Sequence, residues 1–259
     1  MSSRAPRFLQ FPPFPRAGTH ETERDSYNRC VERLLLTERC EHGAFLSYLY
    51  HRLAGEAVRL GGRSELAFAG GRAAVRLEVP DARALLPAAA DAVCEVLAIG
   101  YKFRFLEQRL NVCLPRRERR LFAAALIAAD YAGDRRYVRE RLPSLAECAV
   151  DGVYCFRLGA LREKWETIAA CIPAGFSAPD LVRFCAYLAG ESRRTVYVKG
   201  NSVYRDDFSL LTRSRLTGGE DAATEIVLSD AGVICCLGEV EGSVGDFLQK
   251  YYAQCAIFS

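Results

Sequence analysis

The sequence predicts a mostly helical α+β fold, with N-terminal helices and a β-hairpin, a central helical bundle, and a small mixed α/β unit at the C-terminus. Three observations support this class. Apolar residues recur at intervals of three and four through most of the first 190 positions, as on amphipathic helices. A Gly-Gly pair separates two β-rich runs, which is typical of a hairpin. Short β-rich runs punctuated by Gly and Asp follow residue 194.

The first 22 residues are expected to form a flexible tail that contains Pro, Phe and Arg. The steps into Pro12, Pro13 and Pro15 favour extended backbone over helix. The segment also lacks the continuous apolar stretch of a secretory signal peptide. We therefore expect the chain to stay in the cytoplasm.

A first folded unit is expected at residues 23–100. Apolar spacing over 21–60 predicts two helices that are interrupted near 41–43. The alternating residues of 65–69 and 73–79, joined by Gly70 and Gly71, then predict a β-hairpin. Helical spacing returns over 82–110, which adds a long helix to this unit.

Residues 101–190 are expected to form a helical bundle. Pro115 is suited to a helix start, and the apolar stripe that follows is expected to end near 131–133. Further helices are predicted at 135–148, 151–172 and 178–189. Ser177 is a good N-cap for the last of these helices, and Gly190 is a good stop.

The remaining residues, 191–259, are expected to form the small α/β unit. Strands are predicted at 195–198, 225–228, 232–237 and 255–258. A short helix is predicted at 244–252, directly before the last strand. No internal repeat or low-complexity block occurs in the chain.

Bulk composition is that of a soluble globular protein. Half of the 259 residues are hydrophobic and about a quarter are charged. The longest clean apolar run, 121–129, is less than half of the roughly 20 residues that span a bilayer, so no membrane span is expected. The 11 cysteines are odd in number and form no CxxC motif, which favours reduced thiols over a disulfide framework.

The segment Asp151–Ile172 combines aromatic residues, an arginine and the only tryptophan of the chain. Its apolar residues are separated by three, four, three and four positions, so they share one helix face: Leu158, Leu161, Trp165, Ile168 and Ile172. We expect Trp165 to be a packing anchor in the core. Arg157 lies near the edge of this stripe and is expected to clamp a carboxylate or helix-end carbonyls, or otherwise to contact a partner.

No catalytic, cofactor-binding or metal-binding residues are assigned, and no cofactor is expected. GxSxG, GxGxxG and GxxxxGK[ST] motifs are missing. The only local metal candidates are two cysteines and two histidines: Cys30, Cys40, His42 and His51. On a continuous helix Cys40 and His51 would share a face, but His42 would point almost the opposite way. A hydrolase or metal enzyme remains open only if distant segments converge, for example His42 or His51 beside Asp206, Asp207 or a cysteine.

Charge is distributed unevenly along the chain. Residues 101–145 carry 11 basic and five acidic residues, about +6, whereas 217–259 carry one lysine and seven acids, about −6. The candidate basic patch consists of Arg116, Arg117, Arg119, Arg120, Arg135, Arg136, Arg139 and Arg141. These side chains are suited to binding nucleic acid or an acidic partner. The alternative is a solvated surface that the acidic C-terminal region of the same chain partly neutralises.

The run VDGVYCFRL at 150–158 follows a predicted helix, RRYVRERLPSLAECA, and precedes another, LVRFCAYLA. This succession, over 101–197, resembles the central signature of the YtxC-like sporulation protein family of endospore-forming bacteria. The resemblance implies a process, sporulation, and contacts with other macromolecules, but no reaction. An unknown protein partner is favoured over nucleic acid. The candidate interaction or structural residues of the signature are Tyr154, Phe156, Arg157 and Trp165.

Overall fold

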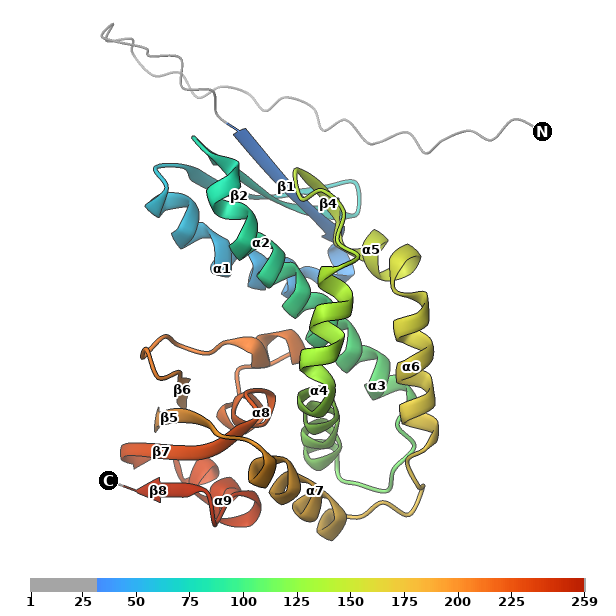
Figure 1. Cartoon of the computed structure of the whole chain (residues 1–259), viewed down its shortest axis with the longest axis vertical. Coiled ribbons are helices and arrows are strands. Elements are labelled where there is room, and N and C mark those ends of the chain that lie inside the picture. Colours follow the sequence, from blue (N-terminus) through green and yellow to red (C-terminus); the bar gives the residue numbers. More distant parts are fainter. Residues whose placement is uncertain (1–31, 259) are drawn as a thin grey trace, which may run out of the picture.

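The computed structural model describes residues 32–258, so the predicted tail at 1–22 lies outside the described residues. The α+β class is confirmed. Two four-stranded mixed sheets lie at opposite ends of the molecule, and the central helices run between them (Figure 1).

The N-terminal sheet has the strand order β2-β3-β1-β4. Its strands are β1 (Glu32–Arg39), β2 (Arg63–Ala69), β3 (Arg72–Val79) and β4 (Glu147–Ala149). The predicted Gly-Gly hairpin is confirmed, because Ala69 pairs with Arg72 across Gly70 and Gly71, whose φ angles are +57° and +76°. β4 runs parallel to β1 and brings 147–149 into this sheet, so the end of the helix predicted at 135–148 is a strand.

The prediction of a helix before residue 41 is wrong for the described part, since 32–39 forms β1. Leu34, Leu36 and Glu38 are buried while most residues between them keep contact with solvent, which is the alternation of a strand. In the sequence, Leu34 and Leu35 follow Val31 at spacings of three and four, which imitated a helix. The second predicted helix is confirmed as α1 (Gly43–Arg59), which packs on the sheet after a short turn, η1 (Cys40–His42).

The predicted helix at 82–110 is confirmed and forms the centre of the molecule. It consists of α2 (Ala82–Glu95), a π-helical turn η2 (Val96–Tyr101) and α3 (Lys102–Arg109). It is the one helix of the described chain that is long and apolar enough to cross a membrane. However, 72% of its apolar window is buried inside the fold, and Glu95 and Lys102 are buried with it. The helix is therefore a core helix, in agreement with the expected lack of a membrane span.

The predicted helix end at 131–133 is wrong. α4 (Arg116–Arg139) continues through Gly133, so the helix expected from Arg135 is its last part. Gly133 is exposed, and its neighbours leave space around it. A single exposed glycine weakens a helix by about 1 kcal/mol but does not end it.

The segment 151–172 forms two helices rather than the single predicted one. α5 (Val150–Arg157) and α6 (Gly159–Ala170) meet at Leu158, whose backbone leaves the helical region while its side chain is fully buried. The next predicted helix is confirmed as α7 (Ala178–Glu191), where Ser177 and Asp180 form a capping box. The predicted stop at Gly190 is wrong by one residue, because the helix continues to Glu191.

The C-terminal sheet has the strand order β6-β5-β7-β8. Its strands are β5 (Arg194–Gly200), β6 (Ser202–Tyr204), β7 (Ala231–Val240) and β8 (Ala256–Phe258). The helix predicted at 244–252 is confirmed as α9 (Gly242–Tyr251). The strand predicted at 225–228 is wrong, because these residues belong to α8 (Ala222–Leu228), which Asp221 caps. All seven residues of α8 are buried, so its sequence shows no period that separates helix from strand.

Candidate interaction site around helix α5

Helix α5, which contains most of the VDGVYCFRL run, begins directly after β4, at one edge of the N-terminal sheet (Figure 1). Val150 and Val153 point into the core, and Leu158 closes the helix there. Three consecutive residues at its C-terminal end are exposed: Cys155, Phe156 and Arg157. Phe156 is the most exposed large hydrophobic residue of the described chain, at 88%.

Asp151 fastens the start of α5 to the sheet. Its two carboxylate oxygens accept hydrogen bonds from Arg72 on β3, at 2.7 and 3.1 Å, and Arg39 Nε lies 3.4 Å away. Burial alone would raise the pKa of Asp151. The hydrogen bonds and positive charge of Arg72 outweigh burial, so the pKa of this carboxyl lies below its usual value. Asp151 is therefore ionised at neutral pH, and its ion pair with Arg72 holds the start of α5 on the sheet.

Tyr154 fastens the middle of α5 to the central helix. Its ring stacks on that of Tyr101, with the centroids 4.2 Å apart and the planes 25° from parallel. The guanidinium of Arg162, on α6, lies over the Tyr154 ring at 5.3 Å and donates a hydrogen bond to the Cys155 carbonyl. Tyr154 is thus enclosed between two elements, and α5 has little freedom to rotate.

Tyr101 is held in turn by a buried polar cluster. Its hydroxyl donates to Glu38 Oε2 at 2.8 Å, and His42 Nδ1 lies 3.1 Å from Glu38 Oε1 and 3.2 Å from the Tyr101 hydroxyl. Burial, followed by the charge and hydrogen bond of Glu38, raises the pKa of Tyr101 far above its usual value. The Glu38 side chain has no exposed area, so a substrate cannot reach its carboxylate. We interpret the cluster as the anchor of the Tyr101–Tyr154 stack.

Trp165, on α6, is fully buried, which is the environment expected of a packing anchor. Its indole Nε1 donates to Asp134 at 2.8 Å. Asp134 also accepts hydrogen bonds from Lys102 at 2.7 Å and Lys164 at 2.8 Å. Sequence periodicity does not indicate this network, because its members lie on three different helices.

Arg157 is exposed and reaches the end of α4. Its Nη1 lies 3.4 Å from the carbonyl oxygen of Arg141, two residues beyond the last residue of α4. This is the type of partner expected for a clamp, although the contact is long for a hydrogen bond. Arg157 therefore combines a helix-end contact with an exposed position beside Phe156.

The eight arginines of the candidate basic patch do not form one surface. They lie at the two ends of α4, and 19 residues separate Arg116 from Arg135, which corresponds to about 28 Å of helix. Five of them have partners within the protein. Arg135 and Arg139 contact Asp91, Arg136 and Arg141 contact Glu140, and Arg120 contacts Glu107 and the Thr217 carbonyl.

Three arginines at the start of α4 have no carboxylate within 4.0 Å among the described residues: Arg116, Arg117 and Arg119. The expected neutralisation by the acidic C-terminal region is not seen in the ion pairs of the described residues. In the ion pair that joins the two regions, the C-terminal region supplies the positive charge: Lys250 donates to Glu118 on α4 at 2.6 Å. The start of α4 is therefore the part of the predicted patch that remains positively charged.

The described residues contain no group of three His, Cys, Asp or Glu side chains that would hold a metal ion. Cys30 lies outside them. His42 belongs to the buried Glu38 cluster, and His51 contacts the ring of Tyr50. Within the described residues His42 is thus engaged by Glu38 and Tyr101. All ten cysteines described are free, in agreement with the prediction of reduced thiols.

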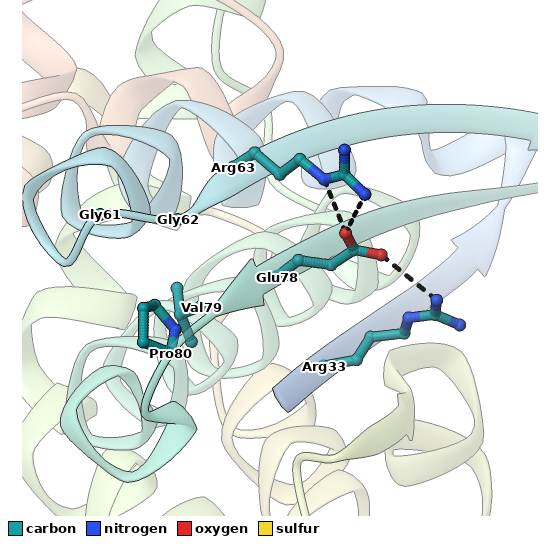
Figure 2. A pocket seen from close by; sticks show the side chains of 7 residues that line it. All are labelled: Arg33, Gly61, Gly62, Arg63, Glu78, Val79 and Pro80. Atoms are coloured by element: carbon teal, nitrogen blue, oxygen red, sulfur yellow. Dashed lines mark hydrogen bonds and ion pairs between the residues drawn. The ribbon is translucent and has the colours of Figure 1, made fainter. Parts of the chain in front are cut away.

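A hollow of about 710 Å³ lies at the edge of the N-terminal sheet, and Figure 2 shows its lining. Glu78 points between two arginines and accepts hydrogen bonds from Arg63 Nε at 2.6 Å and from Arg33 Nη2 at 3.2 Å. The amide groups of Gly61 and Gly62 already donate to carbonyls of α1. The polar groups of this hollow are thus largely used by one another, and we do not assign a ligand to it.

Comparison with protein-family models, with curated proteins and with solved structures finds no match for this chain. Its function therefore has to be argued from its own geometry.

Proposed function

We propose that the protein is a non-enzymatic cytoplasmic protein of the YtxC-like type, which acts in sporulation through a protein–protein contact made by α5. The observation that carries the proposal is the 88% exposure of Phe156 on a helix that is fixed on its other sides. Aromatic residues and arginine are enriched in the cores of protein interfaces, and Phe156 is followed directly by Arg157.

The rigidity of α5 strengthens this argument. A single exposed aromatic residue is ordinary on a flexible surface. Here the Asp151–Arg72 ion pair and the Tyr154–Tyr101 stack determine the orientation of the helix. A fixed aromatic side chain loses little conformational entropy when a partner covers it, so the contact gains affinity.

Nucleic-acid binding is the second candidate function, and the unpaired Arg116, Arg117 and Arg119 favour it. Each phosphate contact adds about 0.9 to the log–log dependence of duplex DNA binding on salt. Eight arginines would give a slope of about 7, whereas three give about 3. Filter binding from low to moderate salt distinguishes these values. A slope near 7 would show that the internal ion pairs open to bind DNA, and binding that does not depend on salt would exclude this function.

The proposed function is tested by deleting the gene in its host and counting heat-resistant spores, followed by complementation with variants. We expect deletion to lower the count and Phe156→Ser to fail in complementation. Phe68→Ser is the matched control, because Phe68 is 62% exposed on β2, at the opposite edge of the same sheet from β4. Normal sporulation of the deletion strain would refute a role in sporulation. Equal effects of Phe156→Ser and Phe68→Ser would refute a partner contact specific to α5.

A further inference from the structure

The first half of β5 has an open edge. β6 pairs only with Tyr197, Val198 and Lys199, whereas β7 pairs with β5 from Arg194 onward on the other side. The chain leaves β6 in a tight turn and returns alongside it. A pocket of about 480 Å³ lies where β6 has ended, between the start of β5 and the segment that follows the turn.

The lining of this pocket is strongly positive. It contains four arginines and one acid: Arg193, Arg194, Arg205, Arg213 and Asp206. Arg213 is neutralised by Glu95 of the central helix, at 3.0 Å. The other three arginines have no carboxylate within 4.0 Å among the described residues, and the contact of Arg194 with the Ser229 carbonyl is a long 3.4 Å.

Several guanidinium groups without carboxylates around one cavity repel one another and favour a bound anion. The planar guanidinium forms two parallel hydrogen bonds with phosphate or carboxylate oxygens. The cavity is larger than an inorganic phosphate ion requires and falls in the usual range of small-molecule sites. Its size therefore leaves room for a further group attached to the anion.

An aromatic pair adjoins the arginines. Tyr197 lines the pocket, and its ring lies 5.1 Å from that of Phe208. Phe208 ends the tight turn with a φ of +57°, a backbone conformation that a bulky side chain rarely adopts, and it is 62% exposed. Such an unfavourable conformation is often kept where it serves a binding site. Glycine would fit this turn without strain, but it would not provide the ring.

We propose that this pocket binds a nucleotide, with the phosphates on Arg193, Arg194 and Arg205 and the base against the Tyr197–Phe208 pair. Arginine and aromatic side chains together are the combination that recognises nucleotides through charge and stacking. Arg213, held by Glu95, forms a fixed wall of the site. The proposal rests on the C-terminal unit and its contact with Glu95, and it does not depend on the contact proposed for α5.

Titration calorimetry of the 259-residue chain at low salt tests this site with ADP, AMP, adenosine and inorganic phosphate. We expect ADP to bind at least about tenfold more tightly than adenosine or phosphate. Arg193→Ala and Arg205→Ala should each weaken ADP binding about tenfold. Arg117→Ala is the control, because it removes the same charge from an unpaired arginine on α4, and we expect it to change binding less than about twofold.

Phe208→Gly separates binding from folding. It relieves the unfavourable backbone, so the melting temperature should not fall, while ADP binding should weaken. Unchanged affinity of Phe208→Gly, or phosphate binding as tightly as ADP, would overturn the assignment to a nucleotide. No ADP binding at about 1 mM, an equal loss in Arg117→Ala, or binding of single-stranded DNA without binding of ADP would overturn the site as a whole.

Discussion

Trp165 offers a direct test of how the centre of the molecule is held together. Truncation to alanine removes a fully buried indole from between α3, α4 and α6, and such substitutions cost about 3–5 kcal/mol. It also removes one of the three donors to the buried carboxylate of Asp134. Because two lysines still donate to this carboxylate, we expect Trp165→Phe, which keeps a large ring, to cost only about 1–2 kcal/mol.

The free energy of unfolding is measured by urea denaturation followed by far-ultraviolet circular dichroism, because Trp165 is the only tryptophan and its fluorescence is lost in the variants. A typical domain has about 5–15 kcal/mol of stability, so Trp165→Ala should shift the midpoint strongly. The control is Phe156→Ala, which truncates an exposed aromatic residue and should stay within about 0.5 kcal/mol of the parent. If Trp165→Ala lies within about 1 kcal/mol of the parent, the indole is not a core anchor.

Three further predictions concern stability. A Cβ at Gly100 would lie 2.6 Å from the ring of Phe45, so Gly100→Ala should lower the free energy of unfolding by about 1–3 kcal/mol. Gly133→Ala has free space and should raise it by up to about 1 kcal/mol. Both values are measured by urea denaturation, and equal effects of the two variants would refute the packing at the π-helical turn. The pKa of Asp151 is lowered in the folded state. The ionised carboxylate therefore contributes fully to the free energy of unfolding above about pH 4, and this contribution is lost as the pH falls further. Asp151→Asn should therefore cost about 2 kcal/mol at pH 7 and much less near pH 2, and a gap that does not depend on pH would contradict the ion pair. Burial raises the pKa of Glu225, so the folded state keeps a proton that the unfolded state loses, and the parent becomes less stable as the pH rises above about 4.3. Glu225→Gln should escape this loss, and its melting temperature relative to the parent should rise between pH 4 and pH 8; a constant difference would refute the raised pKa.

The sequence was sufficient for elements whose signal is local. The Gly-Gly hairpin and the Ser177 N-cap of α7 depend on residues close together in the chain. Prediction from the sequence failed where an element is buried on all sides, or where the spacing of apolar residues fits both a helix and a strand. α8 is buried on all sides and shows no period, and the consecutive leucines of β1 imitate a helix. Gly133 was interpreted as a helix end, although tertiary packing of the rest of α4 outweighs its weak helix propensity.

The candidate site was predictable only in part. The burial of Trp165 follows from the local spacing of apolar residues. The contacts that hold α5 come from β3 and the central helix, and a single sequence does not pair Asp151 with Arg72 or Tyr154 with Tyr101. Glu38 carried a usable signal, because it occupies an inward position of the alternation of β1 once that segment is interpreted as a strand. The arginines of the basic patch lie far apart because α4 continues without a break from Arg116 to Arg139, which the sequence did not predict.

We propose that α5 holds Phe156 in place for a protein partner, and site-specific photo-crosslinking during sporulation examines this contact in the cell. A benzophenone amino acid is placed at position 156 or, as the control, at position 68, and the protein is recovered after irradiation of sporulating cells. The account predicts one discrete crosslinked protein from position 156 that is missing from position 68 and from irradiated vegetative cells. The same products from both positions, or no product from position 156 in cells that sporulate normally, would contradict it.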